Sequence, residues 1–216
     1  MPDRHAMTDR LAAGDRTFSG ESFAGQSLAR LDLTQCVFDA CDFRGTDLTG
    51  ARLEEARLVR CQGAGAVLRG ADLTDAAIER SDFTTANFSG TRIGGARFTG
   101  CRLSGANFAE AGGIDTRFAE CLLVGANLRR FDFRKLTLDG LDLSEADLTG
   151  ADFRDTVFEH CSLREAALKD ARFKGADLRG CDLGHIELAD APLFKGATVS
   201  KAQAAALLAG FGIKVA

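Results

Sequence analysis

Seven cysteines and three histidines are the residues of this sequence whose types suit nucleophilic or metal-binding chemistry. The positions of six cysteines differ from one another only by multiples of 20, and Cys36 alone lies outside the series. The six are Cys41, Cys61, Cys101, Cys121, Cys161 and Cys181. His160 precedes Cys161 and His185 follows Cys181 by four positions, so thiolate and imidazole groups lie close in sequence. The fold therefore has to explain a regular series of thiols.

An apolar residue or glycine recurs at every fifth position from Phe18 to Leu193. Of these 36 central positions, 34 hold Leu, Phe or Ile, and the exceptions are Gly63 and Gly113. A small residue, usually Ala, Cys, Thr or Ser, stands two positions before each central residue. A period of five fits neither an α-helix nor a β-strand, so the chain has to turn once in each repeat.

Four such repeats of five residues close a square coil of 20 residues. The cysteine series shows the same spacing of 20 independently. Asp or Asn before the central residue and Gly two after it, as in ADLTG at 146–150, supply the groups that tight corners need. All seven cysteines then occupy the small inward position, whereas His160 and His185 lie near corners.

Successive thiols of the series, such as Cys161 and Cys181, would have Cα atoms ~4.8 Å apart, within disulfide range. They point in the same direction, however, and a cytoplasmic chain is kept reduced, so we expect buried free thiols. Inward positions filled by Leu, Phe, Ala and Cys leave no cleft for convergent polar groups. The sequence therefore predicts no catalytic residue, no cofactor and no metal site.

Runs such as ADLTDAAI, ANFSGTRI, EADLTGADF and GADLRGCDL resemble the signature of the pentapeptide-repeat family, and the resemblance covers residues 16–195. It implies an all-β fold, a right-handed quadrilateral parallel β-helix of about nine coils and roughly 43 Å in length. We expect an N-terminal cap or disordered segment at 1–15, the solenoid at 16–195, and a C-terminal helix and tail at 196–216. Ser200 is the expected N-cap of a helix over 201–209.

The C-terminal segment is more apolar than the cover of one coil requires. Its ending QAAALLAGFGIKV is similar to that of the quinolone-resistance members of the family, of the Qnr and MfpA type, which implies an end-to-end homodimer. The expected dimer interface is Leu207, Leu208, Phe211, Ile213 and Val215. The alternative is a cap that covers only the last coil of its own chain.

Two kinds of irregularity interrupt the repeat. Gly63 and Gly113 leave inward positions empty, and we expect a neighbour such as Ile114 to fill the space. Phe131, Leu136 and Leu141 place large residues where small ones belong, so the coil should widen or change its corner geometry there. The register itself never breaks, unlike in Qnr members that project loops from the coil.

A net charge of -4 gives no reason to expect binding to nucleic acid or to a membrane. No stretch is long and apolar enough for a membrane span, and the start has no signal-peptide core, so we expect a cytoplasmic protein. The face with the cysteine series is acidic, whereas the other three are nearly balanced. Its expected partner-binding residues are Asp42, Asp82, Asp142, Glu145, Glu165 and Asp182.

The resemblance implies a non-catalytic protein that binds DNA gyrase or topoisomerase IV. It would either modulate the enzyme or protect it from quinolone-type inhibitors, with partial DNA mimicry as the implied means. Charge alone cannot produce the mimicry, because B-DNA of this length carries roughly 25 charges. Shape and a few specific contacts would have to contribute. The alternative function is a scaffold for protein–protein interaction with an unrelated partner, since a fold does not fix a function.

Overall fold

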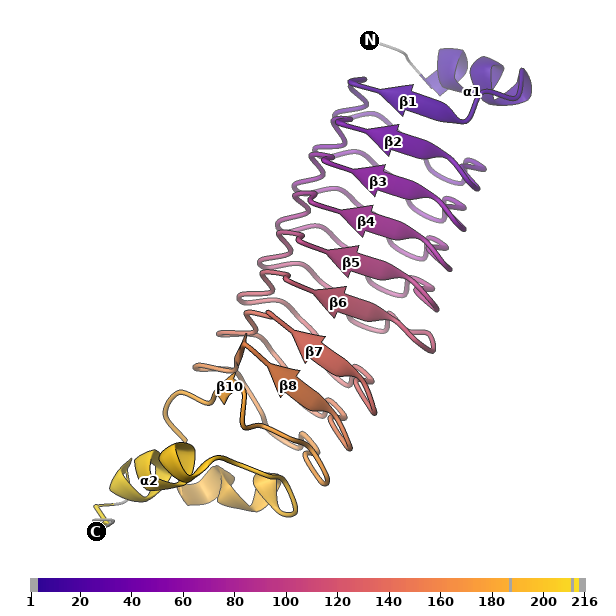
Figure 1. Cartoon of the computed structure of the whole chain (residues 1–216). Helices are drawn as coiled ribbons and strands as arrows, with labels where there is room; N and C mark the ends of the chain where they lie inside the picture. The colour runs from indigo at the N-terminus through magenta and orange to yellow at the C-terminus, as the bar shows by residue number, and fades with distance from the viewer. Residues whose placement is uncertain (1–3, 187, 211, 214–216) are drawn as a thin grey trace.

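The structure, a computed structural model, describes residues 4–186, 188–210, 212 and 213. The chain forms a rod of stacked coils with α1 at one end and α2 at the other (Figure 1). The helices are α1 (Arg4–Ala12), the 3-10 helix η1 (Leu188–Phe194) and α2 (Lys201–Gly210). The strands are β1 (Thr17–Ser19), β2 (Val37–Asp39), β3 (Arg57–Val59), β4 (Ala77–Glu79), β5 (Arg97–Thr99), β6 (Arg117–Ala119), β7 (Thr137–Asp139), β8 (Val157–Glu159), β9 (Cys161–Ser162) and β10 (Cys181–Asp182).

Strands β1–β8 form one parallel sheet in which each strand pairs with the strand of the next coil. The paired residues occupy the same position in successive coils, as Phe18 and Phe38 do. Isolated parallel bridges, such as Asp42 with Gln62, carry the same register around the other faces. The predicted parallel β-solenoid, with four pentapeptides in each coil, is confirmed.

The regular part of the solenoid is slightly shorter than the nine coils expected. Eight strands stack on the first face, and the bridge between Val157 and Asp177 still has the regular spacing. The next bridge, between Asp177 and Thr198, encloses one extra residue because the chain leaves the square path at η1. About eight turns are therefore regular, and the ninth passes into the C-terminal segment.

The core is built from the central residues, which lie above one another in successive coils. Phe88 and Phe108 stack with ring centroids 4.7 Å apart and an interplanar angle of 1°. Phe133 and Phe153 stack in the same way at 4.8 Å. Such aromatic pairs each contribute roughly 0.5–1.5 kcal/mol beyond the burial of their area. The small inward residues are buried beside them, as Ala146 shows.

The corners of the coils require a left-handed backbone. Within the described chain, 18 non-glycine residues have a positive φ, and each has a number that is a multiple of five. Glu145 is one of them, with a φ of 59°, and its N–H donates to the carbonyl of Arg164 in the next coil at 2.8 Å. A left-handed L-residue costs roughly 1–2 kcal/mol, and hydrogen bonds between coils have to offset that cost.

The two glycines at inward positions are accommodated differently, and neither depends on Ile114. A Cβ on Gly63 would lie 2.2 Å from Cε1 of Phe83, so the phenyl ring of the next coil fills the space. A Cβ on Gly113 would lie 2.2 Å from the backbone nitrogen of Gly94, so the backbone itself moves into the gap. Ile114 is 84% exposed, and the expectation that it fills a gap is wrong.

The stacking loosens where the large inward residues occur. Phe131 and Leu141 are buried, whereas Leu136 is only partly buried against the core. In the same stretch, β6 pairs with β7 through Ala119 and Asp139 alone, although the other neighbours in this sheet share three residue pairs. Pairing between the coils is thus reduced in this stretch. The wider coil or changed corner geometry that the sequence predicts stays a prediction.

The N-terminal end of the solenoid is covered by α1, in the segment expected to be a cap or disordered. Met7 is fully buried against the first coil. The Arg10 guanidinium lies 4.4 Å from the centre of the Phe18 ring and forms ion pairs with Asp15 and Glu21. The first coil is thus shielded from solvent by side chains of a helix.

Candidate interaction surfaces

The acidic residues expected to bind a partner do lie along one face, but half of them are already paired with arginines. Asp42 lies 2.6 Å from Arg44, and this hydrogen bond lowers the pKa of the carboxyl group to about 2. The carboxylates of Asp82 and Asp182 also have arginine partners, Arg102 at 3.5 Å and Arg164 at 3.2 Å. Because these pairs are local, they reduce the charge that the face offers to a partner.

The other three predicted residues, Asp142, Glu145 and Glu165, have no ion pair with any residue that the structure describes. Asp142 accepts the N–H of Ser144 at 3.0 Å, which is the short-range turn contact expected of an Asp before a central residue. Glu145 and Glu165 are exposed at left-handed corners of consecutive coils. We call these three residues the acidic patch.

The cysteine series is internal and has no free access to solvent. All seven thiols are free and buried. Burial raises the pKa of Cys61 to about 12 and that of Cys161 to about 11. The Cys61 thiol donates to the carbonyl of Phe38, at 3.4 Å, in the preceding coil. Neutral thiols of this kind act as small core side chains.

The histidines lie outside the core, away from the thiols. His160 is at a left-handed corner, with Nδ1 3.0 Å from Oδ1 of Asp139, and this contact raises the pKa of the imidazole. His185 is exposed near the end of the solenoid. The described residues contain no group of three or more His, Cys, Asp and Glu side chains arranged to hold a metal ion.

The side chain of Gln203 joins the C-terminal helix α2 to the last coil by hydrogen bonds. Ser200 is its N-cap, as predicted: the Gln203 N–H donates to Ser200 Oγ at 3.2 Å, and Gln203 Oε1 accepts the Ser200 N–H at 2.6 Å. This is a capping box. The Gln203 amide also donates to the carbonyls of Leu178 and Cys181, at 2.7 and 2.6 Å. The helix therefore closes the open end of the solenoid.

The residues expected in a dimer interface divide into two groups. Leu207 packs partly against the core, so it belongs to the cap of its own chain. Leu208 and Ile213 are 36% and 51% exposed. Phe211 and Val215 lie outside the described residues. The segment thus covers the solenoid end and still presents apolar side chains outward.

Comparison with known protein families agrees with this architecture. The family described as pentapeptide repeats (8 copies) matches residues 18–54 and 46–84, and the one described as a pentapeptide repeat region matches 91–166 and 113–188. The chain belongs to the pentapeptide-repeat proteins. No curated protein sequence matches it significantly.

Solved structures similar to this pentapeptide-repeat protein include three of QnrB1, described as a plasmid-mediated fluoroquinolone resistance protein. A trypsin-treated variant is 24% identical, covers 93% of this chain and 97% of its own, and gives a TM-score of 0.79. A second trypsin-treated variant gives 0.79 at 23% identity, with 93% and 98% covered. Full-length QnrB1 gives 0.60 at 21% identity, with 91% and 100% covered. At these identities the likeness establishes the fold.

Two further surface properties of this pentapeptide-repeat protein follow from the described chain. Neither α2 nor any other described helix combines the length and the hydrophobicity that crossing a bilayer requires.

A basic hollow around Gly150 was not predicted from the sequence. Acids near one end of a face balance bases near the other end, so the net charge of a whole face does not indicate the hollow. Sorting them by face and by coil would have revealed it.

Proposed function

We propose that this pentapeptide-repeat protein is a non-catalytic binding protein whose partner is a type II topoisomerase, either DNA gyrase or topoisomerase IV. The observation that carries the proposal is the match to QnrB1, which extends over 93% of this chain and 97% of that chain. QnrB1 is described as a fluoroquinolone resistance protein, and fluoroquinolones act on type II topoisomerases. The proposed action is to modulate the enzyme in the cytoplasm or to protect it from such inhibitors.

The interior of the solenoid supports a binding role rather than a catalytic one. The inward positions carry apolar side chains and neutral thiols, as Leu143 and Cys161 illustrate. Catalysis requires convergent polar groups in a site that excludes water. Buried hydroxyls such as that of Thr46 donate to backbone carbonyls, and the charged groups of the described residues lie along the outer faces, where they can meet a partner.

The acidic patch is the proposed contact surface, because Asp142, Glu145 and Glu165 have no ion-pair partner within the described structure. A surface that normally holds DNA is basic, and carboxylates would steer the rod toward it. Full DNA mimicry is not required. The whole chain carries a formal net charge of -4, far below the roughly 25 charges of a comparable length of B-DNA. Shape and a few contacts would carry the specificity.

The test is an assay of gyrase-catalysed supercoiling, with and without a quinolone, on the full chain and on a Glu145→Lys, Glu165→Lys variant. We expect the wild-type protein to inhibit or protect the enzyme and the variant to need about tenfold more protein for the same effect. Two reversed charges, each worth at least about 0.5–1 kcal/mol, account for that loss. Higher salt should weaken the wild-type effect more than that of the variant.

The matched control is Glu55→Lys with Asp75→Lys. These two residues are also exposed at left-handed corners of consecutive coils, but on another face. The control variant should act like the wild type. Equal losses in both variants would mean a nonspecific charge effect. If the wild-type protein leaves both topoisomerases unaffected, the partner is a different one and the protein is a scaffold of another kind.

A further inference from the structure

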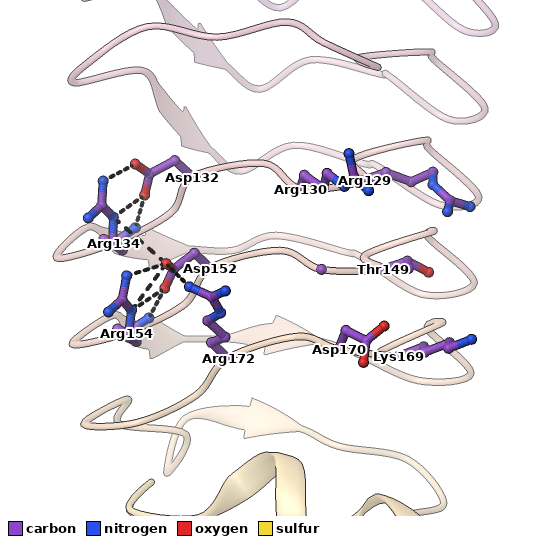
Figure 2. Close-up of a pocket in the computed structure, with 11 residues that line it drawn as sticks. Arg129, Arg130, Asp132, Arg134, Thr149, Asp152, Arg154, Lys169, Asp170 and Arg172 are labelled. Atoms are coloured by element: carbon purple, nitrogen blue, oxygen red, sulfur yellow. Dashed lines mark hydrogen bonds and ion pairs between the residues drawn. The ribbon is translucent and has the colours of Figure 1, made fainter.

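A hollow whose lining is dominated by basic side chains surrounds Gly150 (Figure 2). It has a volume of about 830 Å³ and is lined by six bases and three acids, for a local formal charge of +3. The bases are Arg129, Arg130, Arg134, Arg154, Lys169 and Arg172. The acids are Asp132, Asp152 and Asp170. The site is therefore strongly basic on a chain whose net charge is -4.

One side of the hollow is a paired network that holds its side chains in place. Arg134 and Asp132 interact at 2.6 Å, and Arg154 and Asp152 interact at 2.6 Å in the next coil. Arg172 of the following coil lies 3.8 Å from the same Asp152 carboxylate. Figure 2 shows Arg134 above Arg154 on one side of the hollow, with Arg172 next to Asp152. Two carboxylates thus share three guanidinium groups, which leaves positive charge uncompensated.

On the opposite side of the hollow, Arg129 forms an ion pair with Asp147 at 3.0 Å, whereas two other bases have no partner. Neither Arg130 nor Lys169 forms a side-chain hydrogen bond or an ion pair with a residue that the structure describes. Between their coils lies Gly150, where a Cβ would be 3.2 Å from Cγ of Arg130. Because glycine has no side chain, the space between the two bases stays open.

The fold itself does not require basic residues here. Arg134 and Arg154 occupy the same position in consecutive coils. Four coils before Arg134, that position holds an acid, Glu54. The position after it shows no such contrast, because it holds Glu55 and Asp75 in early coils and Asp155 beside the hollow. The sign of the charge therefore changes at one position of the coil while the backbone stays the same. This reversal points to a ligand rather than to the needs of folding.

We propose that this hollow binds a compact oligophosphate, that is, a ligand with two or three linked phosphoryl groups such as a pyrophosphate or triphosphate moiety. Several negative charges in a small volume match the local charge of +3. Guanidinium groups bind phosphate oxygens in a bidentate manner, and lysine adds a point charge. Arg130 and Lys169, the two unpaired bases, lie two coil spacings apart, about 9–10 Å, so both can contact one oligophosphate ligand. This site is separate from the proposed topoisomerase contact.

The experiment is isothermal titration of the full-length protein with inorganic triphosphate, compared with an Arg130→Gln, Lys169→Gln variant. The wild type should show saturable binding with one site per chain. The variant should bind at least about tenfold more weakly, because it loses two charge-assisted contacts. The matched control is Arg30→Gln with Arg69→Gln: both residues are exposed and unpaired in the described structure and occupy the corresponding positions of earlier coils. This control variant should bind triphosphate as tightly as the wild type does.

Four results would overturn the proposal. One is the absence of saturable triphosphate binding, and another is an equal loss of binding in both variants. The third is tighter binding of a polyglutamate peptide than of triphosphate, which would assign the hollow to an acidic protein segment. A single-stranded oligonucleotide that binds more tightly than triphosphate and loses affinity in the Arg130→Gln, Lys169→Gln variant alone would instead assign it to nucleic acid and would also contradict the proposal.

Discussion

A residue in this solenoid is supported mainly by the residue at the same position of the neighbouring coil, so a change in one coil is compensated in the next. Gly63 illustrates this rule, because the ring of Phe83 occupies the space where its Cβ would stand. The sequence indicated the vacancy at both glycines. It could not show how each is filled, because the choice between a ring and the backbone depends on the shape of the neighbouring coil. That is why Ile114 was assigned wrongly.

Replacing Gly63 by alanine should destabilise the protein by about 1–3 kcal/mol, because the added methyl group overpacks the core against Phe83. Urea unfolding followed by circular dichroism would measure the loss. Gly112→Ala is the matched control, since nothing lies within 4 Å of the position of its Cβ. A Gly63→Ala, Phe83→Leu double variant should lose less stability than the sum of the two single variants. Equal stability of Gly63→Ala and Gly112→Ala would contradict this account.

The elements themselves, short strands and tight corners, were almost fully predictable from the period of five. Phe38 could be placed above Phe18 by counting alone. The sequence indicated where the coils would be irregular, near β6 and β7, but not which strand pairing would be lost. Three large residues compete for inward space, and the structure buries Phe131 and Leu141 while Leu136 stays partly exposed. That outcome is decided by packing between coils, which no local pattern encodes.

At the end of the solenoid, Gln203→Ala should release α2 from the last coil. The substitution removes the acceptor of the capping box and both bonds to the carbonyls of Leu178 and Cys181. Losing these contacts should cost about 1–3 kcal/mol locally, and stacked coils transmit little of it to the middle of the rod. Hydrogen exchange of the amides of 201–210 should accelerate at least about fivefold. Exchange in β3 and β4 should stay unchanged.

Gln35→Ala is the control for this change. The Gln35 amide donates to an exposed carboxylate of Glu55 at 3.0 Å, so its loss should be nearly neutral. If Gln203→Ala accelerates exchange throughout the rod to the same degree, α2 is not a local cap and the solenoid unfolds as one unit.

For the whole molecule, the sequence located the charges correctly on the faces of the rod but overestimated the free charge of the acidic face. Asp82 and Arg102 occupy the same position of successive coils and form an ion pair at 3.5 Å. The repeat length is sufficient to predict such a pair, because residues one coil apart are neighbours in this fold. Pairs within one repeat, such as Asp42 with Arg44, also depend on side-chain geometry that spacing does not determine.

The exposed side chains of Leu208 and Ile213 give one end of the rod an apolar surface through which two chains can associate. We expect a twofold, end-to-end homodimer through the C-terminal segment, with a mass of twice the 22.9 kDa chain in light scattering. A Leu208→Asp, Ile213→Asp variant should elute as a monomer, because carboxylates buried in an apolar interface lose their hydration. Leu122→Asp is the control, since Leu122 is 43% exposed on the side of the rod and should leave the dimer intact. A monomeric wild type, or a double variant that still dimerises, would show that the segment only caps its own chain.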